Sequence, residues 1–218
     1  MSRNVLFSVL LIAVAPVCAA APVSVQVLDR NGRPVSGLVV TLQAPNTDRS
    51  ASTPEPIMDQ VDQRFVPFVL PVRSGTAVKF PNSDSVAHQV YSFSAPKRFE
   101  LGLYRGRPHA PVTFDKPGIV VLGCNIHDKM IGYVYVTDAA HFGKTDAQGI
   151  WRAESVPPAQ YQLDVWSPLL ARDEPSVRQA LLVTDAQANA NANALVIQLK
   201  RPVQPEPAAQ PDRKLRDY

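Results

Sequence analysis

The sequence lacks the long hydrophobic runs of a membrane protein and the charge excess of a nucleic-acid-binding protein. No segment approaches the roughly 20 consecutive apolar residues that a membrane helix needs, so no span is expected. The formal net charge over 218 residues is only +3, too small to predict binding to nucleic acid or other polyanions. Aromatic residues make up just 7%, whereas prolines number 21 and short valine-rich runs are frequent. This composition argues against a helical bundle and favours an all-β, sandwich-like fold.

One short apolar run, residues 5–14, follows Arg3 and precedes the small residues 18–21. A basic start, a short apolar core and a small-residue exit are typical of a secretory signal peptide. We therefore predict that residues 1–20 are a cleaved signal peptide and that the mature chain is periplasmic. A lipid anchor at Cys18 is the alternative, although the residues before it match a lipobox poorly.

Cysteine is also scarce, with only Cys18 and Cys124 in the chain. Removal of the signal peptide leaves Cys124 alone in an oxidising compartment, where no internal disulfide can form. A lone thiol there is expected to be buried, paired with another molecule or bound to metal. The sequence has no G-x-S-x-G, no phosphate-binding loop and no convincing acid–base pair, so we do not expect an enzyme.

The rest of the chain alternates short apolar runs with turn residues. The Asn31-Gly32 turn between the first two runs predicts a hairpin. The Pro-rich, charged stretch 201–218 has few large apolar side chains and is expected to be disordered. The predicted strands are 23–28, 38–42, 65–72, 77–80, 87–93, 112–114, 119–122, 133–136, 161–166, 181–183 and 195–199.

A potential metal-binding motif follows the predicted strand 119–122. Cys124, His127 and Met130 stand at three-residue intervals, so a tight loop can turn their side chains towards one point. His88, on the predicted strand 87–93, can add a fourth ligand from a neighbouring strand. Two imidazoles, one thiolate and a weak axial thioether form the blue-copper type of site, whereas zinc ordinarily avoids a thioether. The alternative is that these residues only fill a core and a loop.

Three further residues are candidates of lower rank. His109 and His141 have no partner at ligand spacing, so both are expected to be loop histidines. Met58 precedes the central strands, where core packing is expected and an additional copper contact is the alternative.

The motif together with Phe80-Pro81-Asn82-Ser83-Asp84 and His88 resembles the cupredoxins, and its C-x-x-H-x-x-M loop is similar to that of amicyanin. The stretch 78–130 looks more closely like the cupredoxin-like methylamine-utilisation proteins. The resemblance implies a Greek-key β-sandwich over residues 56–138, holding one type 1 copper ion. Two positions depart from the cupredoxin pattern: Gln89 replaces an asparagine, and Asp128-Lys129 replaces an apolar docking rim.

The flanking segments resemble another module. The pattern D-x-x-G-x-P-V at 29–35, T-D-x-x-G at 145–149 and Y-x-L-x-V at 161–165 are similar to transthyretin-like or carboxypeptidase-regulatory-like sandwiches. This resemblance implies an immunoglobulin-like β-sandwich built from residues 22–50 and 139–200, with the cupredoxin domain inserted. A single larger sandwich is the alternative.

The resulting functional hypothesis is a periplasmic copper protein that passes electrons to and from a periplasmic redox partner, through His88, Cys124, His127 and Met130. One alternative is a copper delivery or accessory factor using the same ligands. The other is a metal-free carbohydrate-binding or adhesion module, suggested by the transthyretin-like flanks and by Trp151 and Trp166, which look exposed in the sequence.

Overall fold

A computed structural model of the chain describes residues 20–44, 55–106, 110–170, 176–184 and 194–206. These ranges contain sixteen strands and no helix, which confirms the all-β prediction. Within them, no helix is long and apolar enough to cross a membrane. The predicted signal peptide and His109 lie outside the described residues, apart from Ala20.

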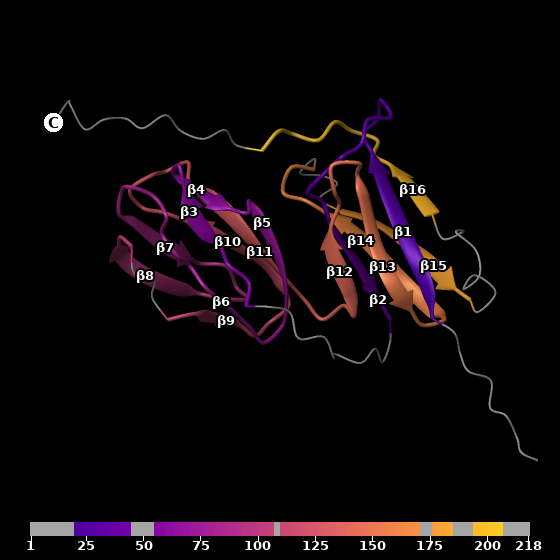
Figure 1. Ribbon diagram of the computed structural model, residues 1–218, viewed down its shortest axis with the longest axis horizontal. Coiled ribbons are helices and arrows are strands. Elements are labelled where there is room, and N and C mark those ends of the chain that lie inside the picture. Colours follow the sequence, from indigo (N-terminus) through magenta and orange to yellow (C-terminus); the bar gives the residue numbers. More distant parts are fainter. Residues whose placement is uncertain (1–19, 45–54, 107–109, 171–175, 185–193, 207–218) are drawn as a thin grey trace, which may run out of the picture.

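The middle of the chain forms one group of sheets, here called the central sandwich (Figure 1). A five-stranded sheet has the order β5-β11-β10-β7-β8, and two small sheets pair β3 with β4 and β6 with β9. Their inward side chains share one core, which includes Phe65, Phe80, Phe114 and Leu122. The strands are β3 (Asp59–Val61), β4 (Arg64–Val66), β5 (Val69–Arg73), β6 (Thr76–Val78), β7 (His88–Ser92), β8 (Phe99–Tyr104), β9 (Val112–Phe114), β10 (Gly118–Gly123) and β11 (Ile131–Thr137).

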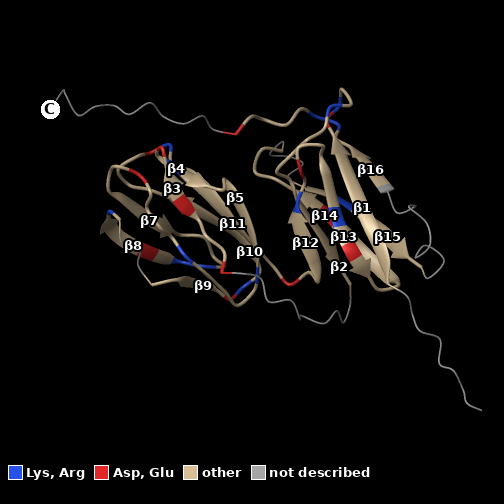
Figure 2. Ribbon diagram, viewed as in Figure 1, with Lys and Arg blue, Asp and Glu red and all other residues tan. Residues whose placement is uncertain are grey.

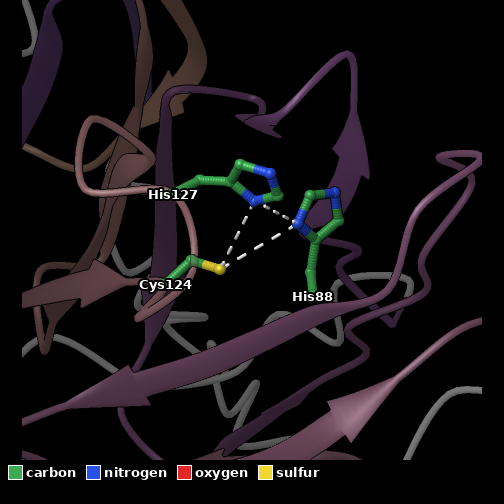
Figure 3. A group of neighbouring side chains, drawn as sticks. All are labelled: His88, Cys124 and His127. Carbon is green, nitrogen blue, oxygen red and sulfur yellow. Dashed lines mark hydrogen bonds between the residues drawn. The ribbon is translucent and has the colours of Figure 1, made fainter. Parts of the chain in front are cut away.

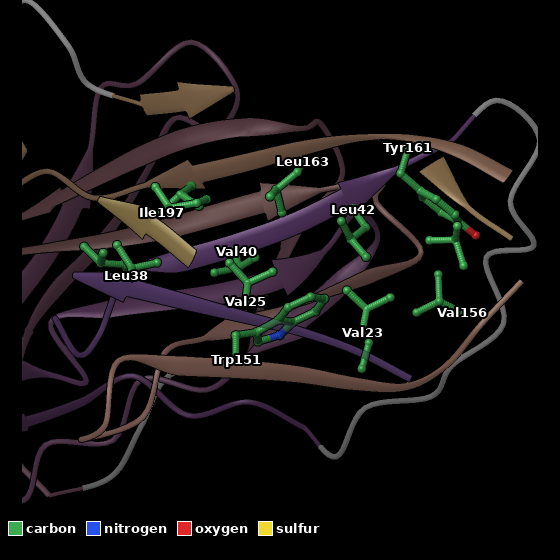
Figure 4. Close-up of a cluster of buried hydrophobic side chains, with 14 of the residues drawn as sticks. Val23, Val25, Leu38, Val40, Leu42, Trp151, Val156, Tyr161, Leu163 and Ile197 are labelled. Carbon is green, nitrogen blue, oxygen red and sulfur yellow. The ribbon is translucent and has the colours of Figure 1, made fainter. Parts of the chain in front are cut away.

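Strands from both ends of the chain form a second group, here called the outer sandwich. One sheet has the order β13-β1-β16 and the other β12-β2-β14-β15. Along β1, buried side chains alternate with more exposed ones, as expected where one face of a strand covers a core. Figure 4 shows these side chains meeting between the sheets, with Trp151 and Tyr161 among them. The strands are β1 (Ala21–Leu28), β2 (Val39–Gln43), β12 (His141–Lys144), β13 (Ile150–Val156), β14 (Ala159–Trp166), β15 (Ser176–Val183) and β16 (Ala194–Gln198).

Two local predictions are wrong. The first two strands do not form a hairpin, because β1 pairs with β13 and β16 while β2 pairs with β12 and β14 in the opposite sheet. The connection from Asp29 to Leu38 therefore crosses between sheets. The predicted strand 65–72 is two strands, β4 and β5, separated at Pro67-Phe68. Proline has no backbone N–H to give to a sheet ladder, so strand pairing is interrupted there.

The aromatic residues and the C-terminal tail also differ from expectation. Trp151 and Trp166 are 5% and 6% exposed, so the expectation of surface tryptophans is wrong, and the sugar-binding alternative loses one of its two grounds. The segment expected to be disordered begins with ordered residues: Gln204 N–H donates to the Leu169 carbonyl at 3.0 Å, and Val203 packs against the outer core. Residues 207–218 lie outside the described part.

The two sandwiches touch through a small aromatic cluster. Trp166, on β14, packs against Tyr133 and Tyr135 of β11, with ring centroids 6.1 and 5.1 Å apart. Val39 and Val69 are buried in the same cluster. Acidic and basic residues are interspersed along both sandwiches (Figure 2), as expected from the small net charge.

Candidate metal centre

Three of the predicted ligands converge at one end of the central sandwich. His88 Nδ1 lies 3.1 Å from His127 Nδ1, and Cys124 Sγ lies 3.9 and 4.0 Å from these two nitrogens. Figure 3 shows both rings and the thiol turned towards a common point. These three residues form a group able to hold a metal ion.

Strand pairing explains why residues 36 positions apart meet. His88 is the first residue of β7, and Cys124 directly follows β10. These strands are neighbours, with Gly123 opposite Tyr91. A backbone hydrogen bond of 2.8 Å from Met130 N–H to the His127 carbonyl then closes the loop after the cysteine.

The spacing of the three donor atoms can be tested against ordinary metal geometry. An ion about 2.0–2.1 Å from each nitrogen and about 2.3 Å from sulfur would have an angle of about 100° between the nitrogens and about 130° from sulfur to each nitrogen. Those angles add up to nearly a full circle, so the three donor atoms could all reach one ion at ordinary bond lengths. The residues therefore fit a trigonal site of two imidazoles and one thiolate.

Met130 lies at the end of the same loop and is 1% exposed. Its side chain and Cys124 belong to the same buried core cluster. The structure thus keeps the thioether out of water, in the core cluster that also contains Cys124, while its role as a ligand stays a prediction.

Sequence reasoning missed Asp84, which contacts His88 from the side away from the other donors. Asp84 Oδ2 lies 2.9 Å from His88 Nε2. A carboxylate on the outer nitrogen of a metal-binding histidine fixes the ring orientation and leaves the inner nitrogen free to bind. The spacing Asp-x-x-x-His was visible in the sequence, but carboxylates at that distance from a histidine are too common to single out.

The electrostatic surroundings favour a thiolate at Cys124. Burial alone would raise the pKa of this thiol, but a hydrogen bond with His88 and backbone N–H groups of Gln89, Ile126 and His127 bring its pKa below the usual value. Burial acts to lower the pKa of His88, yet its contacts with Cys124 and Asp84 raise it above the usual value. Thiolates are the form in which cysteine binds metal.

The pKa of His127 lies below the usual value for histidine. Burial is the main cause, and the nearby His88 adds to the effect. The adjacent Asp128 is exposed and is not among the causes.

Gln89 also has a defined role. Its side-chain oxygen accepts a hydrogen bond of 2.7 Å from Asn125 Nδ2. Because Asn125 follows Cys124 directly, this contact braces the ligand loop against β7. The departure from the cupredoxin pattern therefore does not remove support from the loop, and glutamine provides it instead.

The lower-ranked candidates lie in other parts of the sequence from the ligand loop, and no contact between either of them and the three donors is seen in the described residues. Met58 is 0% exposed in the central core. His141 lies on β12, where its ring contacts Tyr161 at a centroid distance of 6.3 Å. Within the described part of the chain, His141 belongs to no cluster that could hold a metal.

Comparisons with known proteins find solved structures that are similar to less than half of this chain. No family model and no curated protein sequence matches the chain. A copper-containing nitrite reductase from Thermus scotoductus is similar over 43% of this chain, with 25% identity and a TM-score of 0.37; the match spans only 25% of that enzyme. A reduced Cu(I) variant of amicyanin matches 45% of this chain and 98% of its own, with 19% identity and a TM-score of 0.35. A purple cupredoxin from Nitrosopumilus maritimus matches 37% of this chain and 96% of its own, with 24% identity and a TM-score of 0.31.

Proposed function

We propose that the chain binds one copper ion at His88, Cys124, His127 and Met130 and carries single electrons as a type 1 copper protein. The observation that carries this proposal is the convergence of one sulfur and two imidazole nitrogens, which lie 3.1 to 4.0 Å from one another. Copper would supply a centre that changes its charge by one electron.

The donor set favours copper over zinc. Zinc sites in proteins usually take four ligands from cysteine, histidine and carboxylates. A carboxylate is available here, but Asp84 contacts the outer nitrogen of His88 instead of lying among the donors. The remaining buried group near the three donors is the Met130 thioether, a soft ligand suited to copper.

The surrounding residues suit electron transfer because they hold the donors in place. His88 is fully buried and is fixed by Asp84, while three backbone N–H groups point at the Cys124 sulfur. A site whose ligands are already oriented requires little rearrangement when the charge of the ion changes. With four protein donors, no coordination position would remain for a substrate, so we propose a carrier rather than an enzyme.

The wider assignments are part of the same proposal. We assign the central sandwich to a cupredoxin domain, related to the cupredoxin-like methylamine-utilisation proteins through the motifs of residues 78–130. The outer sandwich is a transthyretin-like domain in two segments. Residues 1–20 direct export to the periplasm, where a redox partner protein exchanges electrons with the site. Fractionation of cells that express the full chain tests the location.

Titration of the mature protein with Cu(II) tests the metal assignment. We expect one equivalent to produce an intense visible charge-transfer band that disappears on reduction and returns on oxidation. Cys124→Ser should abolish the band, whereas Met58→Leu, a change of a buried methionine outside the loop 124–130, should keep it. A colourless adduct, or tighter binding of Zn(II) than of copper, would contradict the proposal.

The delivery alternative is separated by following the metal through redox cycles. A carrier keeps its copper in both oxidation states and exchanges electrons faster than it releases the ion. Transfer of Cu(I) to a competing chelator on the time scale of reduction would instead favour a delivery factor.

A further inference from the structure

The hydrogen bond between Asp84 and His88 has a consequence beyond copper binding itself. Asp84 is a short side chain held between two parts of the central sandwich, and its side chain is only 12% exposed. Its Oδ2 atom receives contacts from two sides: His88 Nε2 at 2.9 Å and the backbone N–H of Gln63 at 2.8 Å. The Ser85 N–H donates to its other oxygen at 2.8 Å.

These contacts fix the charge of Asp84 as well as its position. Both carboxyl oxygens accept backbone N–H donors, from Gln63 and Ser85, and one of them also contacts His88 Nε2. Hydrogen bonds donated to both oxygens favour the ionised carboxylate. Asn82 adds a further restraint, because its side-chain oxygen accepts the Asp84 backbone N–H at 3.0 Å.

The donor from Gln63 comes from an unusual piece of backbone. Asp62 and Gln63 form the turn between β3 and β4, and both have positive φ values, 50° and 56°. Residues other than glycine adopt this conformation at an energetic cost, and such strain is often found at functional sites. Here the turn directs the Gln63 N–H at Asp84, so the β3–β4 hairpin supports the carboxylate from outside the ligand loop.

We infer that Asp84 is the positioning residue that sets the reduction potential of the site, an inference that rests on the proposed copper function. The carboxylate accepts a hydrogen bond from the Nε2–H of His88, which leaves Nδ1 as the metal-binding atom. Its negative charge, passed through the imidazole ring, stabilises Cu(II) more than Cu(I). Asp84 thereby lowers the potential relative to a neutral residue at the same position.

The size of the effect follows from the geometry. Nδ1 binding, the width of the ring and the 2.9 Å hydrogen bond place the carboxylate roughly 7 Å from the ion. A unit charge at that distance, with an effective dielectric constant of about 20, changes the ratio of Cu(II) to Cu(I) affinities by about 50-fold. At 59 mV per tenfold change for one electron, the expected rise in potential on neutralising Asp84 is about 100 mV.

The experiment compares two isosteric changes in the copper-loaded, full mature chain. Asp84→Asn removes the charge at the buried contact, and Asp128→Asn removes the same charge from an exposed position in the ligand loop. We expect cyclic voltammetry to show a rise of about 100 mV for Asp84→Asn and less than a third of that for Asp128→Asn, because water screens exposed charges. Equal shifts in both variants, or none in Asp84→Asn while the blue band persists, would overturn the inference and leave the copper assignment standing. Absence of a blue band in the unchanged protein would refute both.

A second measurement does not depend on copper redox chemistry. In the zinc-loaded protein, which is diamagnetic, NMR should show a slowly exchanging His88 Nε2–H that is lost in Asp84→Leu. Replacing Asp62-Gln63 by Asn-Gly, the sequence preferred for such a turn, keeps the backbone N–H that contacts Asp84. We expect the reduction potential of this variant to differ from that of the unchanged protein by less than about a fifth of the Asp84→Asn shift. A solvent-exchanging Nε2–H in the unchanged protein would mean that Asp84 does not hold the ring.

Discussion

Replacement of Gly149 by alanine tests whether the two flanking segments of the chain form one folding unit. Gly149 belongs to the T-D-x-x-G motif and has a φ of 70°. A Cβ atom at this position would lie 2.5 Å from the Val27 carbonyl oxygen and 3.0 Å from the Val35 nitrogen. Both neighbours are backbone atoms of the N-terminal segment, so they cannot move aside without displacing β1.

The magnitude can be separated into two parts with a matched control. Gly32 also has a positive φ, 79°, but a Cβ there meets nothing within 4 Å. Gly32→Ala therefore carries only the conformational cost, about 1–2 kcal/mol. Gly149→Ala carries that cost and an overpacking term of about 1–3 kcal/mol. We expect the free energy of unfolding to fall by about 2–5 kcal/mol in Gly149→Ala.

Two optical probes assign the loss to one sandwich. The chain has only two tryptophans, and Trp151 and Trp166 both lie on strands of the outer sandwich. Trp151 lies in the outer core, so the fluorescence of the Trp166→Phe background during urea unfolding reports the outer sandwich, and the expected copper–thiolate band reports the central one. In Gly149→Ala the fluorescence midpoint should fall well below that of Gly32→Ala, while the absorbance midpoint changes less. Equal midpoints for the two glycine variants would refute the packing argument, and an identical fall of both probes would indicate one cooperative unit.

Three other changes test the site and its supports. Met130→Leu and Met58→Leu each replace a buried methionine of the same core. Each change should lower the free energy of unfolding by less than about 1.5 kcal/mol. Only Met130→Leu should alter the copper spectrum and the reduction potential. Gln89→Ala removes the hydrogen bond to Asn125 and should lower the stability by about 1 kcal/mol, with faster loss of copper to a chelator; an unchanged release rate would show that the loop needs no brace. Trp166→Ala removes a buried ring from the contact between the sandwiches and should lower the free energy of unfolding by about 3–5 kcal/mol, measured by circular dichroism.

The parts of the site that the sequence predicted are those fixed by local spacing. Cys124, His127 and Met130 lie within one loop, so their offsets alone predict that the side chains can converge. His88 needed the further inference that its strand lies beside the one before the cysteine, and the pairing of β7 with β10 is what brings it there. Asp84 could not be recognised, because its role depends on which nitrogen of His88 faces outward, a property of the folded ring.

The errors in the fold have a similar origin. The Asn31-Gly32 turn was correctly identified as a turn, with Gly32 at positive φ, but a turn signal does not say whether the next strand returns to the same sheet. Likewise, burial of Trp151 and Trp166 depends on the opposite sheet and the neighbouring sandwich, neither of which is visible in the alternation of a single strand. A period-two pattern predicts that one face of a strand is buried. It does not predict whether another element covers the second face.

The outer sandwich packs against the strand that follows the loop 124–130. β11 begins at Ile131, directly after Met130. The same strand carries Tyr133 and Tyr135, whose rings contact Trp166 of the outer sandwich. On its other edges β11 pairs with β10, which ends beside Cys124, and with β5. The strand that holds one end of the ligand loop is therefore fixed both by its own sheet and by aromatic packing from outside it. Because a rigid strand restrains the residue that precedes it, this packing limits how far the Met130 thioether can move relative to the Cys124 sulfur.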